Sequence, residues 1–381
     1  MRRKILYVSG SRADYGLMRS VLFRINNHPD MELHIAATGM HLMPEFGNTI
    51  NEIRQDGYTF HRIDVTYAQD TKESMALFIG GFIQKFADLV RIIRPDFILL
   101  LGDRGEMLGG AIVGAYLGVP LVHIHGGEVT STVDEFARHA ITKLSHIHLP
   151  ATEESAQRII KMGEDPRYVF VVGAPGLDEI LKVQPASVKE IADHYTIDPS
   201  IPLILVLQHP VPLEPGDPAF QMNETLTAVC GFPHQIFIIY PNADAGGRAM
   251  IDVIKRYAST KNIRAFQSIE HRDFLQLLKI SSVIVGNSSA GIIEAPSFGV
   301  PAINIGTRQN GRQKGENVID AGYNSHEIVT AINRVLYDEA FKRKVKTAIN
   351  PYGDGNSSKK IVEILKKIVI TPDLLQKRMR Y

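Results

Sequence analysis

Short apolar runs alternate with amphipathic segments along most of this 381-residue chain, and this alternation limits the fold more than any other feature. Residues 97–101 and 236–239 are continuously apolar, as expected for parallel strands that are buried on both faces. Segments between the runs, such as 15–26, 70–93 and 134–144, carry apolar residues at helical spacing. Strand and helix alternating in this way predict parallel sheets with helices on both faces.

The expected strands form two series along the chain. The first series is residues 4–10, 32–38, 60–65, 96–102, 120–126, 146–151 and 168–173. The second series is residues 202–208, 235–241, 263–269, 282–286 and 301–306. Further helical patterns are expected at residues 249–259, 292–298 and 357–370.

The rhythm is interrupted between residues 173 and 200, which contain three prolines and two short helical patterns. We therefore place an interdomain hinge near residues 173–176 and expect an α/β protein with two Rossmann-like, doubly wound domains that face a cleft. The expected domains are residues 1–174 and 175–356, followed by a last helical segment, 357–381. Ligands of such sheets bind outside the carboxyl ends of the strands, so the loops after the strands should carry the function.

The charge balance argues against one large class of partner. Lysine and arginine total 42, and aspartate and glutamate total 41, so the basic excess typical of nucleic-acid binders is missing. The longest apolar-looking segment, residues 75–93, contains glutamine, lysine, aspartate and arginine, which argues against a membrane span. Residues 1–8 do not form a secretory signal, and a single cysteine, Cys230, fits a reducing compartment. We expect a cytoplasmic protein without a nucleic-acid or membrane partner.

Charged residues follow two expected strands of the first domain. Arg12 lies in a glycine-flanked loop that leads into a helix, where backbone amides and a guanidinium can meet an anion. Asp103 and Arg104 come directly after the apolar run 97–101. Asp103 can act as an acid or base, and Arg104 can neutralise a phosphate. The first loop is not G-x-G-x-x-G, so a nicotinamide site is not supported.

His125, Glu128 and Asp134 lie within ten residues of one another, downstream of the next expected strand. Such a group can supply the two proton-transfer side chains that an elimination or epimerisation needs. No H-E-x-x-H pattern or cysteine cluster occurs, so the sequence predicts no metal site. Three other histidines are interpreted as buried residues that hydrogen-bond loops: His123, His146 and His148.

Polar side chains also follow the expected strands of the second domain. They are His209, Asn242, Ser288, Ser289 and Arg308. Amides and hydroxyls at a helix N-terminus form a seat for an anion, and Ser288 and Ser289 fit a diphosphate there. Glu294 lies in the helical pattern that follows, where a carboxylate can hold two ribose hydroxyls. These residues predict an enzyme that binds a nucleotide sugar, and they leave transfer, elimination and epimerisation as alternatives.

Nine short motifs occur in order along nearly the whole chain. They are S-R-A-D-Y at 11–15, G-D-R at 102–104, H-I-H-G-G-E at 123–128, R-H-A-I-T-K at 138–143, Q-H-P at 208–210, N-A-D at 242–244, G-N-S-S at 286–289, G-T-R-Q at 306–309 and Y-G-D-G-N at 352–356. Together they resemble the hydrolysing UDP-N-acetylglucosamine 2-epimerases of sialic acid and related nonulosonic acid synthesis.

The resemblance implies two Rossmann-like domains similar to those of GT-B glycosyltransferases, with a C-terminal helix that returns to the first domain. It implies no metal or redox cofactor, a UDP-sugar substrate, UDP as a product and a homodimer or homotetramer. The implied reaction has two stages. Elimination of UDP across C1 and C2 of UDP-N-acetylglucosamine gives 2-acetamidoglucal, and addition of water then gives N-acetylmannosamine.

The same resemblance assigns roles to residues. Asp103 and Asp134 are the implied acid and base groups. Some members have a glutamate where this chain has His125, so either His125 or Glu128 takes the second proton-transfer role. The residues implied to bind UDP are Arg12, Arg104, His209, Asn242, Ser288, Ser289, Glu294 and Arg308.

Four alternatives are compatible with these motifs. The first is the same reaction on UDP-N,N'-diacetylbacillosamine, the substrate of relatives in legionaminic acid synthesis. The others are a non-hydrolysing epimerase, a GT-B glycosyltransferase with a separate acceptor and a non-catalytic nucleotide-sugar sensor.

Overall fold

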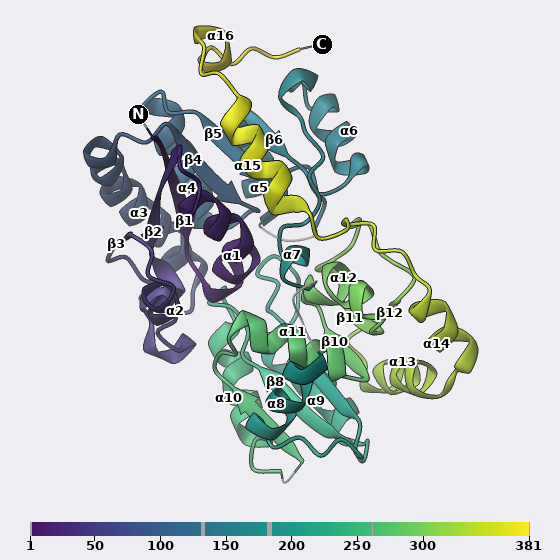
Figure 1. Ribbon diagram of the computed structural model, residues 1–381. Helices are drawn as coiled ribbons and strands as arrows, with labels where there is room; N and C mark the ends of the chain where they lie inside the picture. Colours follow the sequence, from purple (N-terminus) through teal and green to yellow (C-terminus); the bar gives the residue numbers. More distant parts are fainter. Residues whose placement is uncertain (1, 131–133, 181–184, 261, 381) are drawn as a thin grey trace.

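A computed structural model describes residues 2–130, 134–180, 185–260 and 262–380 of the chain. Its core is two six-stranded parallel sheets with helices on both faces, which confirms the expected fold class (Figure 1). Both sheets are doubly wound, because the strand order reverses between β1 and β4 in one and between β7 and β10 in the other. Reversal points of this kind open a crevice at the carboxyl ends of the strands.

The first sheet has the order β3-β2-β1-β4-β5-β6. Its strands are β1 (Arg3–Ser9), β2 (Met31–Ala37), β3 (Phe60–Arg62), β4 (Phe97–Leu101), β5 (Leu121–Ile124) and β6 (Ile147–Leu149). The helices between and after them are α1 (Arg12–Asn26), α2 (Ile50–Gln55), α3 (Lys72–Ile93), α4 (Gly105–Tyr116), α5 (Asp134–Leu144), α6 (Glu153–Lys161) and α7 (Leu177–Ile180). Short 3₁₀ turns lie at Gly39–Leu42, Pro44–Phe46 and Pro166–Tyr168.

The second sheet has the order β12-β11-β10-β7-β8-β9. Its strands are β7 (Leu203–Leu207), β8 (Gln235–Ile239), β9 (Ile263–Phe266), β10 (Val283–Gly286), β11 (Ala302–Ile305) and β12 (Val318–Ala321). The helices of this half are α8 (Pro185–His194), α9 (Pro218–Cys230), α10 (Gly247–Tyr257), α11 (His271–Ile280), α12 (Ala290–Ile293), α13 (Ser325–Tyr337) and α14 (Glu339–Lys346). A 3₁₀ turn at Ala295–Phe298 follows α12.

Helical spacing explains how the first sheet is covered. Phe78, Phe82 and Phe86 recur every fourth residue of α3 and are buried, so one stripe of this helix packs on the sheet. Helix α4 shares that apolar cluster, whereas α1 covers the opposite face. Helix α1 begins with a capping box. The Ser11 side chain accepts a hydrogen bond from the backbone N–H of Asp14, and the Asp14 carboxylate accepts one from the backbone N–H of Ser11.

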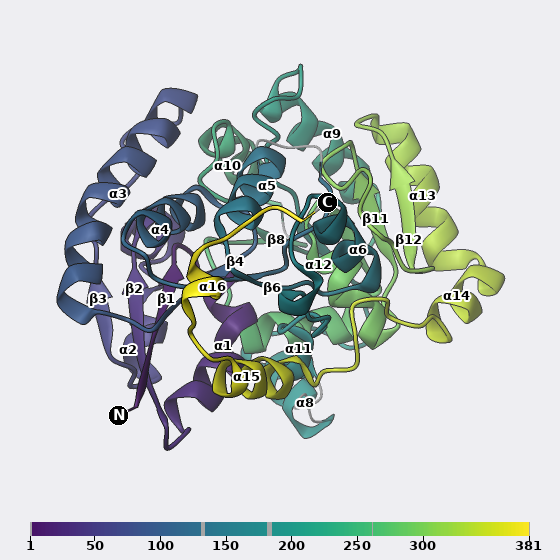
Figure 2. The ribbon, with the colours of Figure 1, turned by 90° about the horizontal axis from the view of Figure 1, so that it is seen from above.

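The chain ends against the first half of the molecule. Helix α15 (Ser357–Lys367) runs beside α1 in both views, and its Ile361 and Leu365 belong to the apolar core beneath the first sheet (Figures 1 and 2). The short helix α16 (Pro372–Leu375) follows it. The expected domain boundaries at 174 and 356 stay predictions. Among the described residues, no helix is both long enough and apolar enough to cross a bilayer.

Three details of the expected secondary structure are wrong. Residues 168–173 were expected to form a strand, but they make only an isolated bridge to β6, between Val169 and His148, at the sheet edge. Strand β12 was not expected, because its Val-Ile-Asp-Ala sequence is short and carries a charge. The helical pattern at 292–298 splits into α12 and a 3₁₀ turn, because Pro296 lacks the N–H that would continue the helix.

Candidate active site

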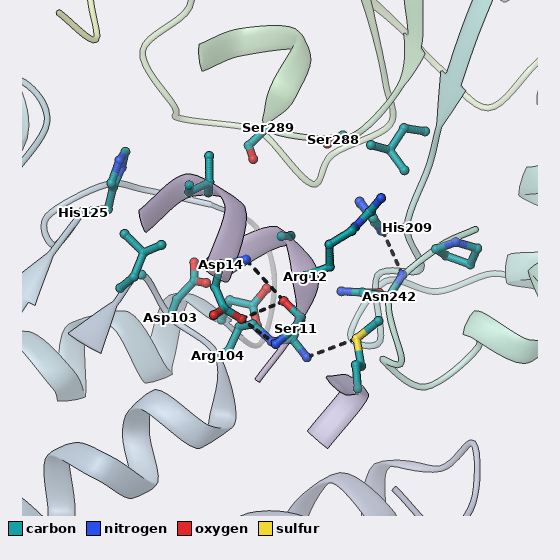
Figure 3. Close-up of a pocket in the computed structure, with 18 of the residues that line it drawn as sticks. Ser11, Arg12, Asp14, Asp103, Arg104, His125, His209, Asn242, Ser288 and Ser289 are labelled. Carbon is teal, nitrogen blue, oxygen red and sulfur yellow. Dashed lines mark hydrogen bonds between the residues drawn. The ribbon is translucent and has the colours of Figure 1, made fainter. Parts of the chain in front are cut away.

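The carboxyl ends of both sheets face one cavity of about 230 Å³ between the two halves (Figure 3). Eleven of the twelve site residues expected from the sequence line it, and Glu294 is the exception. From the first half come Arg12, Asp103, Arg104, His125, Glu128 and Asp134. From the second half come His209, Asn242, Ser288, Ser289 and Arg308. The structure therefore places acid and base candidates opposite the expected diphosphate seat.

Asp103 and Arg104 lie in the loop between β4 and α4. Gly102, with φ of +74°, turns the chain at the end of β4, a conformation that favours glycine. The carboxylate of Asp103 pairs with the guanidinium of Arg138, which is almost completely buried. This ion pair holds the Asp103 side chain in one position beside the cavity.

Arg104 is fixed by a buried carboxylate. Its Nε donates to Glu106 Oε1 at 2.8 Å, and its Nη2 lies 3.4 Å from the hydroxyl of Tyr67. Glu106 is fully buried, and a Cβ atom at Gly10 would lie only 1.8 Å from Glu106 Oε1. Gly10 therefore leaves the space in which Glu106 reaches Arg104.

Arg12 extends from the first turn of α1 toward the second half. Its guanidinium donates to the backbone carbonyl of Ile269. Figure 3 shows Arg12 between the Asp103–Arg104 loop and the side chains of His209 and Asn242. One positive charge thus lies between the two groups of site residues.

His125 and Glu128 form a pair directly after β5. His125 has φ of +61°, which is uncommon for a residue other than glycine. His125 Nδ1 lies 2.7 Å from Glu128 Oε1, and the other carboxylate oxygen of Glu128 pairs with Arg312 from the second half. The pair is therefore connected to both halves of the molecule.

Asp134 is the first residue of α5, and its Oδ2 lies 3.8 Å from Arg308 Nη2. Arg308 comes from the loop after β11 and also donates to the carbonyl of Asn287 at 3.3 Å. A carboxylate of the first half and a cation of the second half thus meet beside the cavity.

His209 follows β7 and is held as a neutral ring. Burial, and then the positive charges of Arg308 and Arg104, lower the pKa of His209 well below its ordinary value. The backbone N–H of Asn242 donates to His209 Nδ1 at 3.1 Å. Because Nδ1 accepts, Nε2 carries the proton of the neutral ring and can donate to an anion in the cavity.

Ser288 and Ser289 lie between β10 and α12, next to the buried Asn287. Asn287 Oδ1 accepts a hydrogen bond from the backbone N–H of His209 at 2.7 Å, and Asn287 Nδ2 donates to the backbone carbonyl of His209 at 2.9 Å. These bonds tie the serine loop to the end of β7. Figure 3 shows both serines on the opposite side of the cavity from Asp103.

Glu294 directly follows α12, next to Ile293, which lines the cavity. Its Oε2 is buried and has no hydrogen-bond partner among the described residues. Burial raises the pKa of Glu294 to about 7. An unpartnered buried carboxylate oxygen is a site that a ligand hydroxyl can satisfy.

The other histidines behave as expected from the sequence. His123 contacts the carbonyl of Gly102 at 2.7 Å through Nε2, and the hydroxyl of Thr142 through Nδ1. His146 accepts the backbone N–H of Leu121, and His148 lies 3.0 Å from Glu164. Within the described ranges, no three His, Cys, Asp or Glu side chains are arranged to hold a metal ion.

Comparison with known proteins gives the family. The UDP-N-acetylglucosamine 2-epimerase family model matches residues 24–366. The chain belongs to the UDP-N-acetylglucosamine 2-epimerase family. UDP-N,N'-diacetylbacillosamine 2-epimerase (hydrolyzing) of Legionella pneumophila is 42% identical over all of both chains. UDP-N-acetylglucosamine 2-epimerase of Neisseria meningitidis is 38% identical over 87% of each chain.

The fold comparison agrees with this family. The crystal structure of UDP-GlcNAc 2-epimerase from Neisseria meningitidis bound to UDP-GlcNAc has a TM-score of 0.80 and 20% identity, over 96% of this chain and all of that one. The family-model match and the sequence identity to the Legionella protein confirm the family resemblance expected from the motifs.

Three side chains that shape this epimerase-family site were not among the residues expected from the sequence. They are Glu106, Arg138 and Arg312. Glu106 and Arg138 lie inside or beside recognised motifs, but only the folded structure shows which charged partners they meet. Arg312 lies 184 residues from Glu128 in the chain, so no local pattern reveals their contact.

Proposed function

We propose that the protein is a hydrolysing 2-epimerase that converts UDP-N,N'-diacetylbacillosamine and water to UDP and 2,4-diacetamido-2,4,6-trideoxymannose. The observation that carries this proposal is the 42% identity to the Legionella enzyme over the full length of both chains. From the sequence, UDP-N-acetylglucosamine was the first expectation, and the diacetylbacillosamine sugar was the alternative. The whole-length match favours the alternative.

The proposed first stage breaks two bonds. A base of the first half removes the proton from sugar C2, while the C1–O bond breaks and its electron pair leaves with the diphosphate. A C1–C2 double bond forms in the sugar. Asp103 and Asp134 are the proposed acid and base groups, because both line the cavity that the second half closes.

Positive charge and donors stabilise the leaving diphosphate. Arg12 and Arg104 approach from the first half, whereas Arg308, His209 and the loop of Ser288 and Ser289 approach from the second. Further proposed contacts of UDP are Asn242 and Glu294. In the second stage, water adds its oxygen to C1 and a proton is delivered to C2 on the face opposite to that of removal, which inverts C2.

A second candidate substrate is UDP-N-acetylglucosamine. The Neisseria relative that carries the name of this activity is 38% identical over 87% of each chain. The two sugars differ at C4, which carries either an acetamido group or a hydroxyl, and at C6, which carries either hydrogen or a hydroxyl.

Incubation of the purified protein with each UDP-sugar in heavy water tests the proposal. The expected result is UDP release with one deuterium at C2 of the free sugar, and a higher kcat/KM for the diacetylbacillosamine substrate. A product that still carries UDP would show a non-hydrolysing epimerase instead. UDP release without deuterium at C2 would contradict elimination.

A further inference from the structure

Helix α10 begins at Gly247 in the second half without a capping side chain of its own. Its N-cap residue is Gly246, which has no side chain and lies in the left-handed region with φ of +96°. The first turn of the helix carries no acidic residue either. The first N–H groups of a helix have no partner within the helix, so they need acceptors from elsewhere.

The first half of the molecule supplies these acceptors. Asp70 Oδ1 accepts the backbone N–H of Gly246 at 2.9 Å, and Asp70 Oδ2 accepts the backbone N–H of Arg248 at 3.1 Å. Asp70 therefore acts as an N-cap for α10, although it lies 176 residues from Gly246 in the chain. Its negative charge also suits the positive end of the helix dipole.

The position of Asp70 is set by the helix that follows it. The next residue, Thr71, is the N-cap of α3, and its side chain accepts the backbone N–H of Ser74 at 3.2 Å. On the other side of Asp70, the backbone N–H of Gln69 donates to the Ser74 hydroxyl at 3.1 Å. Two adjacent residues thus cap helices of different halves, and the cap of α10 is anchored to α3.

Two further contacts hold α10 against the first half. Arg248 Nη2 pairs with Glu45 Oε1 at 3.0 Å, but both side chains are partly exposed, so water weakens this ion pair. Ile251 is buried in an apolar cluster that joins the two halves. The buried first-half members of this cluster are Met43, Phe46, Tyr67 and Phe78. The cap by Asp70 is therefore the directional contact, since apolar burial alone does not fix an orientation.

The same end of α10 adjoins the cavity. The backbone N–H of Gly247 donates to the carbonyl of Asp244 at 2.8 Å, and the side chain of Asn242 donates to the carboxylate of Asp244. Asn242 lines the cavity, whereas Asp70 lies outside its lining. Movement of α10 away from Asp70 would therefore also move Asn242 away from the first half.

We propose that Asp70 is a positioning residue, which caps α10 across the cleft and thereby fixes the second-half UDP seat relative to the acid and base groups of the first half. This inference rests on the proposed function, because elimination needs the leaving diphosphate and the base at one sugar. Reacting groups must be held in one geometry, and small displacements lower the rate. Asp70 therefore acts on kcat, while the second-half side chains that bind UDP stay intact.

Kinetics of UDP release from both UDP-sugars tests the effect on the reaction. Asp70→Ala removes both acceptors, and we expect kcat to fall by about 5- to 30-fold, the factor that corresponds to loss of an N-cap. KM, and the dissociation constant of UDP by calorimetry, should stay within about threefold of the wild type. Asp70→Asn keeps one acceptor oxygen, so its kcat should lie between those of Asp70→Ala and the wild type. An asparagine variant as slow as the alanine variant would overturn the capping role.

Asp338→Ala is the matched control for the loss of a cap. Asp338 also accepts two backbone N–H groups, those of Ala340 at 2.9 Å and Phe341 at 3.1 Å, at the start of α14. This cap lies within the second half and outside the cavity lining. Asp338→Ala should therefore keep the wild-type kcat. Equal kcat values for the two alanine variants would overturn the proposal.

Hydrogen exchange tests the contact without turnover. In the full-length protein, peptides that contain Gly246 and Arg248 should exchange these amides at least about fivefold faster in Asp70→Ala than in the wild type, as followed by mass spectrometry. Peptides from the start of α14 should not change. If the wild type releases no UDP from either sugar, the proposed function fails while the exchange still reports on the cap. Unchanged exchange at the start of α10, or a kcat of Asp70→Ala within about twofold of the wild type, would overturn the inference.

Discussion

The guanidinium of Arg138 pairs with the carboxylate of Asp103 beside the cavity, and Arg138 is only 1% exposed. Arg138 also donates to the carbonyl of Glu128 at 3.1 Å and to the hydroxyl of Thr130 at 3.2 Å. A buried arginine with several acceptors has one available position, so it fixes Asp103 more firmly than an exposed ion pair would. Asp103 is therefore placed by α5 as well as by its own loop.

This arrangement predicts the effect of Asp103→Asn. The amide keeps the size of the side chain and an oxygen for Arg138, but it cannot exchange a proton. We expect UDP release to fall by about 100-fold or more, while UDP affinity by calorimetry changes less than about threefold. The exposed Asp88→Asn on α3 is the control. Turnover close to that of the wild type would remove Asp103 from the mechanism.

The seat of the diphosphate gives a second prediction. Ser289→Ala removes a hydroxyl that faces the cavity and leaves the backbone of the loop in place. A hydrogen bond to a charged group contributes about 1.5–3 kcal/mol, so UDP should bind at least about tenfold more weakly. Titration calorimetry measures this, with the exposed Ser259→Ala as the control. An unchanged dissociation constant for UDP would contradict the proposal that the hydroxyl of Ser289 binds the diphosphate.

A third prediction concerns the return of the chain to its first half. Asp178 of α7 accepts the backbone N–H groups of Ser357 at 2.8 Å and Ser358 at 2.7 Å, and so caps α15 from outside. Asp178→Ala should lower the free energy of unfolding by about 1–2 kcal/mol, as loss of other N-caps does. Denaturant unfolding checks this against the exposed Asp193→Ala. Equal midpoints for the two variants would contradict the cap.

Much of the fold can be predicted from the sequence because its parallel strands are buried on both faces. The runs at 97–101 and 236–239 stand out as continuous apolar segments; the first coincides with β4, and the second makes up all of β8 except its first residue. The expected helix at 134–144 has the observed bounds of α5. Strand β12 shows the limit, because an edge strand with an aspartate has neither a continuous nor an alternating apolar pattern.

The site residues also divide into those that the sequence predicts and those whose role only the folded structure shows. Residues that directly follow strands were found, since the carboxyl ends of parallel strands meet at one edge of a sheet. Arg312 also follows a strand, but its contact with Glu128 was not predicted, because that contact depends on how the two halves face each other. Glu106 was missed because a glutamate in the first turn of a helix is ordinary, and only its burial against Gly10 and Arg104 shows its role.

The buried carboxyl group of Glu294 predicts a specific dependence on pH. Burial raises its pKa from 4.5 to about 7, so the folded protein holds a proton that the unfolded chain releases. Between these two pH values the unfolded state binds fewer protons, and the free energy of unfolding therefore falls as pH rises through this window. Glu294→Gln stays neutral, so its unfolding free energy should lack this fall, which amounts to about 3 kcal/mol at most.

Binding of UDP should release the proton that the buried carboxyl group of Glu294 holds. Ribose hydroxyls donating to the unpartnered Oε2 favour the ionised carboxylate, so UDP binding below pH 7 should release a proton from Glu294. Calorimetry at pH 6.5 in two buffers of different ionisation enthalpy measures the protons released. The difference between wild type and Glu294→Gln cancels the proton of the UDP phosphate itself. We expect the wild type to release about half a proton more than the variant. Equal release by both proteins would show that UDP does not meet this carboxyl group.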